Sequence, residues 1–195
     1  MNPIRNRLFL ASTVLSLALG AVAAPAFAAD SMSKERTVTV GGAPMYPSKN
    51  IVQNAVNSKD HTTLVAAVKA AGLVDTLSGP GPFTVFAPTN AAFAALPAGT
   101  VDTLFKPENK GALTKVLTYH VVAGRMTGSD LTAAIKRGGG KATLTTVEGE
   151  PLIATQSGKT LWVADAKGGR AQVSIGDVLQ SNGVIHVVDK VLLPK

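Results

Sequence analysis

Apolar residues change their spacing late in this chain, and this change limits the possible folds more than any other feature. Between residues 51 and 117 they recur every three or four positions, which predicts amphipathic helices. After Gly140 they fall in short runs separated by turn residues, as expected of antiparallel strands. Because helices come first and strands later, the sequence predicts the α+β class.

The expected elements can be placed by residue number. Helices are expected over 51–56, 64–71, 91–96, 101–105, 108–117 and 130–136, with a strand at 84–86 before the third of them. Short strands are expected over 142–147, 152–156, 160–164, 170–175 and 184–193. The last run is apolar at both alternating sets of positions, which is typical of a strand covered on both faces. We therefore expect an antiparallel meander that ends in one fully covered strand.

The first 28 residues have the pattern of a secretory signal peptide. Arg5 and Arg7 precede an apolar stretch, residues 8–24, and Ala26-Phe27-Ala28 matches a small-x-small cleavage site. Polar residues follow instead of a basic stop-transfer cluster, so we expect cleavage after Ala28 and no transmembrane anchor afterwards. The prediction is a secreted or periplasmic protein, and without any Cys it has neither disulfides nor an acylation site.

Residues 29–47 contain two glycines and two prolines without apolar periodicity, and they are predicted to be a flexible linker. Residues 48–194 are predicted to form one domain. Without the two arginines of the leader, 17 of the 19 basic residues remain against 12 acidic ones, a net charge of +5. This excess is spread along the chain and predicts a mixed surface that can meet acidic glycans, while the few aromatic residues argue against nucleic acid.

The three histidines do not form a recognisable metal motif. His61 begins a predicted helix, His120 ends one, and His186 alternates with apolar residues in the last strand. None stands at HExxH or CxxC spacing, so we expect capping or core roles and neither metal nor cofactor. Glu148 and Glu150 flank a glycine in a predicted turn, where two acids are expected to be solvated.

A polar corner follows the strand at 84–86. A hydroxyl beside a sharp strand-to-helix turn can be a nucleophile, but the chain has neither a G-x-S-x-G motif nor a Cys. Pro88 favours extended geometry before it, and Thr89 or Asn90 can accept from the free N–H groups of the next helix. We therefore expect a structural corner and no enzyme activity.

Three ordered motifs resemble those of the fasciclin domain family. TVFAPTNAAF at 84–93 resembles its first box, Tyr119-His120 in TYHVVAG its Tyr-His motif, and residues 182–189 its second box. The resemblance covers roughly 48–194 and looks like a secreted single-domain bacterial-type member. It implies an antiparallel β-wedge or sandwich packed against a layer of short helices. The structural motif residues would be Thr84, Pro88, Thr89, Asn90, Asn182, Gly183 and His186.

The resemblance also implies adhesion or extracellular interaction instead of catalysis. In animal members, integrin-contact motifs have been placed at the Tyr-His region and just before the second box. The matching positions here are Tyr119, His120, Asp177, Val178 and Leu179. Gly176 stands where related motifs often have Lys or Pro, so a different partner is expected here. That partner would be an extracellular protein or a cell-surface glycan, and the sequence leaves its identity and the oligomeric state open.

Two readings of these residues stay open at this point. In the first, the Tyr-His region and the segment before the second box contact a partner. For Tyr119 and His120 the alternative within this hypothesis is that both pack between helix and sheet, with His120 bonding the corner at 87–90. In the second, Thr89, His120 and His186 line a pocket that binds or hydrolyses a small ligand. The second reading requires these three side chains to converge on an open cavity.

Overall fold

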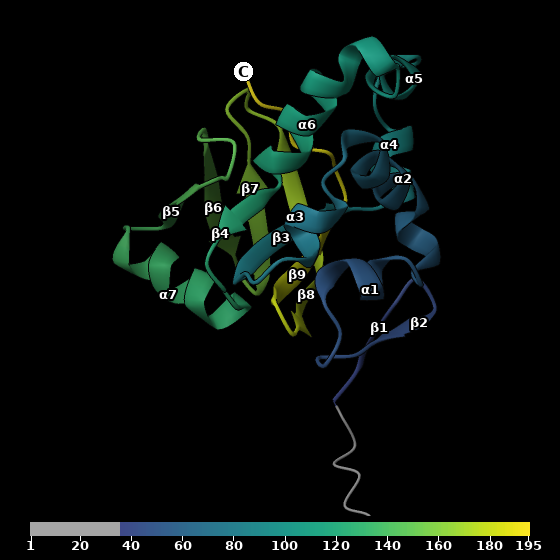
Figure 1. Ribbon diagram of the computed structural model, residues 1–195. Coiled ribbons are helices and arrows are strands. Elements are labelled where there is room, and N and C mark those ends of the chain that lie inside the picture. Colours follow the sequence, from purple (N-terminus) through teal and green to yellow (C-terminus); the bar gives the residue numbers. More distant parts are fainter. Residues whose placement is uncertain (1–35) are drawn as a thin grey trace, which may run out of the picture. The chain divides into compact units, whose positions relative to one another are not determined.

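The computed structural model describes residues 36–195, so the predicted signal peptide and its cleavage point after Ala28 lie outside the described residues (Figure 1). Within this range, none of the helices has the length and apolar character needed to cross a membrane. The α+β prediction is confirmed, because the helices are concentrated before Gly138 and most strands come after it.

Short helices make up most of the first half of the domain. Their bounds are α1 Ile51–Ala55, η1 Lys59–His61, α2 Thr62–Ala71, α3 Val74–Ser78, α4 Asn90–Ala94, α5 Thr100–Leu104, η2 Pro107–Asn109, α6 Lys110–Tyr119 and α7 Gly128–Arg137. Gly72 ends α2 as predicted, because its φ of 74° is left-handed and its N–H bonds back to the Lys69 carbonyl. The helix α3 was not predicted.

The strands form a two-stranded hairpin and one seven-stranded sheet. Their bounds are β1 Val38–Val40, β2 Ala43–Met45, β3 Phe83–Pro88, β4 Val121–Ala123, β5 Lys141–Thr145, β6 Pro151–Ser157, β7 Thr160–Ala164, β8 Arg170–Gln180 and β9 Gly183–Val188. The order in the larger sheet is β4-β3-β9-β8-β7-β6-β5, and only β3 and β9 pair in parallel. The strands β5 to β9 therefore form the predicted antiparallel meander.

The strands β3 and β9 lie between two hydrophobic cores. On one face, Val85 and Ile185 pack with residues of α1, α2, α3, α4 and α6. On the other face, Phe86 and Val188 pack with α7 and with the inward residues of β5 to β8. All six residues of β9 are buried, which confirms the prediction of a last strand covered on both faces. Figure 1 shows α7 beside β5 and β6, with α1 and α2 on the far side of β3 and β9.

The prediction of a flexible linker over 29–47 was wrong for residues 38–45. These residues form the β1–β2 hairpin, and Val40 and Met45 are each only 3% exposed in the core that includes α1 and α2. Gly41 and Gly42 form the turn with φ angles of 58° and 77°, a conformation that favours glycine. Strands of three residues are too short to show an alternation of apolar and polar residues, so glycines and prolines dominate the sequence pattern of this segment.

Candidate functional site

The two polar residues of the corner after β3 bond to different helices. The Thr89 hydroxyl accepts from Ala92 N at 3.2 Å and caps α4. The Asn90 carbonyl oxygen instead accepts from Thr63 N at 3.0 Å, near the start of α2. Its amide nitrogen donates to the Lys59 carbonyl at 2.8 Å. Asn90 therefore secures a helix that begins 28 residues earlier in the chain.

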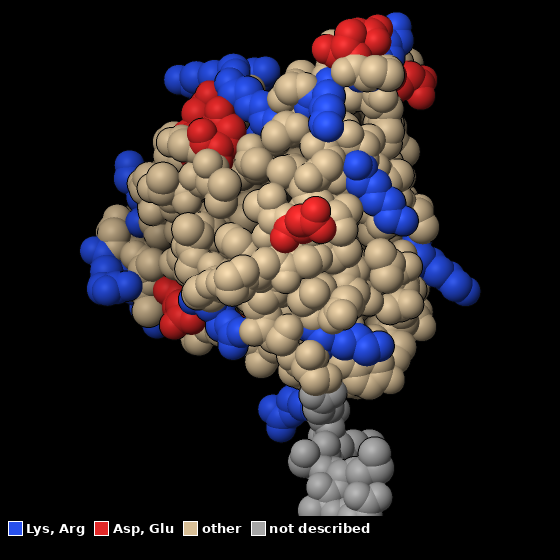
Figure 2. All heavy atoms as spheres, in the orientation of Figure 1, with Lys and Arg blue, Asp and Glu red and all other residues tan. Residues whose placement is uncertain are grey.

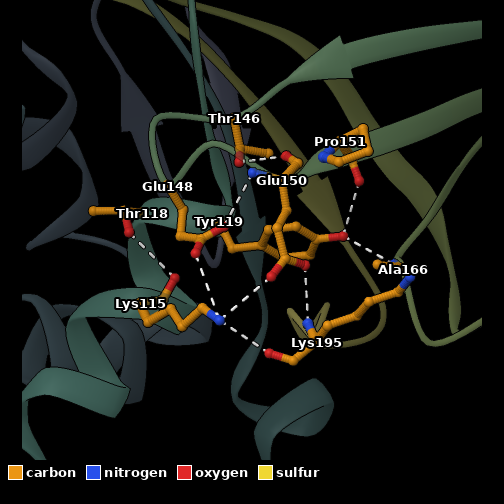
Figure 3. Close-up of polar contacts among 9 residues, drawn as sticks. All are labelled: Lys115, Thr118, Tyr119, Thr146, Glu148, Glu150, Pro151, Ala166 and Lys195. Atoms are coloured by element: carbon orange, nitrogen blue, oxygen red, sulfur yellow. Dashed lines mark hydrogen bonds and ion pairs between the residues drawn. The ribbon is translucent and has the colours of Figure 1, made fainter.

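Tyr119 is fully buried, so its side chain is not accessible at the surface of the domain. Its hydroxyl donates to the Pro151 carbonyl and accepts from Ala166 N, both at 3.0 Å (Figure 3). Burial raises the pKa of this hydroxyl above its ordinary value, so it stays protonated and able to donate. Tyr119 thus joins the end of α6 to the start of β6 and to the turn between β7 and β8. A buried side chain does not fit the expected contact with a partner.

His120 is 2% exposed and has a defined tautomer. Leu192 N donates to its Nε2 at 2.9 Å, so Nδ1 carries the proton and donates to the Val116 carbonyl at 2.7 Å. Burial lowers the pKa of the imidazole to about 4, and the ring is neutral near pH 7. The side chain does not bond the corner at 87–90, but its backbone carbonyl accepts from Phe86 N at 2.9 Å.

The C-terminal segment after β9 lies outside the sheet and is held by side-chain acceptors. His120 accepts a hydrogen bond from Leu192 N. Asp165 accepts one from Leu193 N at 3.0 Å, and Glu150 accepts one from Lys195 N at 2.9 Å. These acceptors come from the end of α6 and from two separate turns of the sheet. His120 of the Tyr-His motif therefore helps to hold the C-terminal segment against the domain.

Glu148 and Glu150 are not the solvated pair that the sequence predicted. Lys115 of α6 lies 3.6 Å from Glu148 and 3.3 Å from Glu150, and the two acidic side chains are only 14% and 26% exposed (Figure 3). The N–H of Lys195 is the main cause that holds the pKa of Glu150 below its usual value. The turn between β5 and β6 is thereby tied to α6 and to the C-terminal segment.

His186 is a buried structural residue of β9. Its ring stacks on Phe86 with centroids 5.7 Å apart. Asp177 N donates to its Nδ1 at 3.4 Å, so Nε2 carries the proton and donates to the Met126 carbonyl at 2.8 Å. Burial lowers the pKa of this imidazole too, which favours the neutral ring.

Asp177 lies at an irregularity in β8, where the pairing with β9 shifts register between Ile175 and Val178. Its φ of 57° is left-handed, a conformation that Asp tolerates better than most residues. Its carboxylate accepts from Gly128 N at 2.6 Å, at the first turn of α7. Asp177 is exposed and at the same time connects the sheet to a helix.

The three positions before the second box differ sharply in exposure. Val178 is fully buried in the core below β8, whereas Leu179 is 40% exposed beside it. Arg125 approaches from the loop before α7, and its guanidinium donates to the Gln180 carbonyl at 2.9 Å. We call Arg125, Asp177 and Leu179 the bulge surface. It combines one exposed apolar side chain with a cation that bonds to the next residue, Gln180, and an anion two residues before it.

Asn182 and Gly183 are required by close packing at the β8–β9 turn. The amide of Asn182 donates to the carbonyls of Leu77 and Gly79 at 2.8 and 2.9 Å, and its oxygen accepts from Ile51 N at 3.0 Å. A Cβ on Gly183 would lie 2.1 Å from the Phe83 carbonyl oxygen. The second box thus holds α1, α3 and β3 together.

Thr84 has a comparable role inside the sheet. Its hydroxyl donates to the Gly124 carbonyl at 2.7 Å and accepts from Met126 N at 2.9 Å. Pro88 ends β3 and pairs with Val188 of β9. The side chains of five motif residues hydrogen-bond within the fold: Thr84, Thr89, Asn90, Asn182 and His186.

The side chains of Thr89, His120 and His186 do not gather around one cavity. Thr89 caps α4, His186 lies between Phe86 and the Met126 carbonyl, and His120 borders an apolar cavity of about 40 Å³ among α1, α2, α3 and α6. Small-molecule sites are usually several times larger, on the order of 300 Å³ or more. Among residues 36–195 no three His, Cys, Asp or Glu side chains are grouped to hold a metal ion.

Charge is dispersed over the face of the domain seen in Figure 2, where Lys and Arg alternate with Asp and Glu across a largely uncharged surface. This agrees with the predicted mixed surface.

Two residues that contribute to the site, Asp165 and Arg125, were not identified from the sequence. The residues 165–169 indicate a turn, and Asp165 accepts there from Lys167 N and Gly169 N, but its contact with Leu193 N has no local signal.

Comparisons with known proteins agree on one family. The fasciclin domain model matches residues 59–194. Protein sll1483 of Synechocystis sp. is 46% identical over 95% of this chain and 94% of its own length. Immunogenic protein MPB70 of Mycobacterium bovis is 35% identical over 99% of this chain and 97% of its own length.

The fold is also found among solved structures. The FAS1 domain pair of the insect cell adhesion molecule fasciclin I superposes with a TM-score of 0.68 at 17% identity, over 82% of this chain and 58% of that chain. The extent of the family match, the identity to full-length relatives and the shared fold agree with the three boxes described above. This chain is a member of the fasciclin domain family.

Proposed function

We propose that this protein is a secreted or periplasmic adhesion module that binds an extracellular protein or cell-surface partner without catalysis. The observation that carries the proposal is the bulge surface, where Leu179 is 40% exposed, Arg125 bonds the carbonyl of the adjacent Gln180, and Asp177 precedes it by two residues. An exposed apolar side chain surrounded by polar groups is the usual form of a small contact point. Its position just before the second box is the one that the family resemblance implies for partner contact.

The geometry also narrows which residues can contribute. Tyr119, His120 and Val178 are buried, so the proposed contact rests on Leu179 and Asp177, with Arg125 added from the structure. The fold of the insect cell adhesion molecule fasciclin I supports the adhesive role at the level of family. The polar residues of the motif boxes are bonded within the fold, which supports the absence of catalysis.

The test compares two matched surface variants, Leu179→Ser and Val147→Ser. Both wild-type side chains are apolar and similarly exposed, 40% and 47%, so both variants are expected to melt like the wild type. The purified full chain is assayed for binding to bacterial envelope fractions and immobilised matrix proteins. Loss of at least about tenfold in affinity with Leu179→Ser alone supports the proposal. Equal binding by both variants and the wild type, or no binding by the wild type, overturns it.

A further inference from the structure

The strands β5 to β8 have one face packed on the core and one face in solvent. Ala142, Leu144, Ala154, Val163 and Ala171 point inward and pack with α7. The alternating residues must therefore point outward, because successive side chains of a strand face opposite sides. We call the outward residues Lys141, Thr143, Thr155, Trp162, Arg170 and Gln172 the outer sheet face. All six are exposed or half-buried.

Four of these residues form a continuous row across the strands. Lys141 pairs with Thr155, Thr155 with Trp162, and Trp162 with Gln172. Directly paired side chains of neighbouring strands have Cβ atoms about 5 Å apart. The row therefore places a cation, a hydroxyl, an indole and an amide at regular intervals across four strands.

Arg170 completes the arrangement around the single tryptophan of the chain. Its guanidinium lies over the Trp162 ring, 5.1 Å from the ring centroid. Such stacking holds the planar guanidinium in place and leaves its N–H groups free to donate. Within residues 36–195, neither the Arg170 guanidinium nor the Lys141 ammonium has a carboxylate or carbonyl partner.

Two acidic residues, Asp165 and Asp189, accept backbone hydrogen bonds in or beside this part of the sheet. Asp165 is 8% exposed and accepts from Gly169 N and Leu193 N. Asp189 accepts from the backbone N–H of Gln172 at 2.7 Å. The turns at the two ends of β7 add two further cations, Lys159 and Lys167. Four exposed cations, Lys141, Lys159, Lys167 and Arg170, therefore outnumber the one exposed carboxylate at this face, Asp189, and leave a positive excess for an anionic ligand.

We propose that the outer sheet face binds a uronate-bearing polysaccharide. The Arg170 fork matches the geometry of a carboxylate, with Lys141 as a second cation along the chain. The exposed part of the indole supports the apolar face of a sugar ring. Thr155 and Gln172 supply donors and acceptors for the sugar hydroxyls. This surface is separate from the bulge surface and its ligand is argued independently of that proposal.

A polysaccharide suits this face better than a protein partner does. The centre of a protein interface is depleted in charge and carries several large apolar side chains. Here Trp162 pairs directly with Thr155 and Gln172 and stacks with Arg170, and the apolar residues in the neighbouring outward row, Ile153 and Ala164, are not aromatic. A linear anionic chain can lie across β5 to β8, along the row of paired residues from Arg170 toward Lys141.

The single tryptophan makes the test direct, because any change in its fluorescence reports on this face. The purified full chain is titrated with oligogalacturonate, with dextran sulfate and with a neutral cello-oligosaccharide. The variants Arg170→Gln and Lys141→Gln are compared with Lys106→Gln, an exposed lysine outside the sheet. Trp162→Phe keeps a ring and is measured by calorimetry. Thermal melts establish that each variant is folded.

The expected result is a fluorescence change with oligogalacturonate that weakens as salt is added. Affinity should fall about tenfold or more in Arg170→Gln and measurably in Lys141→Gln and Trp162→Phe, with less than a twofold change in Lys106→Gln. Leu179→Ser should bind oligogalacturonate like the wild type. The proposal is overturned if oligogalacturonate does not bind, if Arg170→Gln and Lys106→Gln bind equally, or if dextran sulfate or the neutral sugar binds at least as tightly.

Discussion

Leu192 N lies 2.9 Å from Nε2 of His120 and donates to it. The two residues are 72 positions apart, and both are buried. Protonation of the ring would place a second donor against that N–H, so the bond requires a neutral histidine. The Tyr-His motif therefore holds the segment after β9, and it does so in a way that depends on pH.

The free energy of unfolding should fall as the pH drops from 7 to 5. The pKa of His120 is about 4 in the folded protein and near 6.5 when unfolded, so the unfolded chain takes up the proton first. Stability is then complete above about pH 6.5 and decreases below it, by roughly 2 kcal/mol at pH 5. Burial lowers the pKa of His61 and His186 as well, so both add to the loss.

Urea unfolding at pH 7 and pH 5 measures this dependence while most carboxylates remain ionised. His120→Gln should be less stable than the wild type at pH 7 but should lose less between pH 7 and pH 5. A wild-type stability that is the same at both pH values would contradict the assignment of a buried neutral His120.

Asn182→Ala should lower the free energy of unfolding by about 2–4 kcal/mol, since three backbone groups lose their partner. Asn182→Asp is the informative comparison. It keeps an acceptor for Ile51 N but sets a carboxylate against the carbonyls of Leu77 and Gly79. Chemical denaturation at pH 7 should show the Asp variant at least as destabilised as the Ala variant. A near-native Asp variant would show that the two donated bonds contribute little.

Substitutions of Asp177 should rank in stability as Asn, then Gly, then Ala. Asn keeps an acceptor for Gly128 N and tolerates the left-handed φ of 57°. Gly adopts the left-handed backbone conformation easily but lacks the hydrogen bond to Gly128 N. Ala lacks that bond and is also strained at this φ, so its free energy of unfolding should fall by about 1–3 kcal/mol. Thermal melts measure the order. An Ala variant as stable as the Asn variant would remove the structural role assigned to this side chain.

Asn90→Ala should destabilise the domain by about 2 kcal/mol, and Thr89→Ala by about 1 kcal/mol. The difference is expected because the Asn90 side chain bonds Thr63 N and the Lys59 carbonyl, whereas the Thr89 side chain bonds only Ala92 N of its own helix. Thr89→Ser keeps the hydroxyl and serves as the control. Hydrogen exchange should show the first turn of α2 opening in Asn90→Ala and staying protected in Thr89→Ala. The reverse pattern would refute this division of roles.

Local sequence patterns predicted the features of the fold that depend on residues close together in the chain. The spacing of Leu64, Val68 and Ala71 specified α2, and Gly72 marked its end. The apolar run of β9 indicated burial on both faces. The structural nature of the corner at Thr89 followed from its resemblance to a helix cap. These features are set by interactions over a few residues, so they can be read without the fold.

Long-range contacts could not be predicted in the same way. Asn90 looks like a cap for the helix that follows it, yet its oxygen reaches Thr63 because α2 packs beside α4. Tyr119 and Leu179 both matched positions of the family motifs, and only the packing shows that one is buried and the other 40% exposed. The β1–β2 hairpin was missed because its burial depends on core residues that come later in the chain.

The most direct test of this account measures binding and melting together for Leu179→Ser and His120→Gln. Binding is measured on an envelope fraction or matrix protein that captures the wild type, at a temperature where all three proteins are folded. The account predicts that Leu179→Ser melts like the wild type but loses binding, while His120→Gln melts lower and binds normally. A His120→Gln protein that melts normally and fails to bind would contradict it, because the Tyr-His motif would then be the contact site.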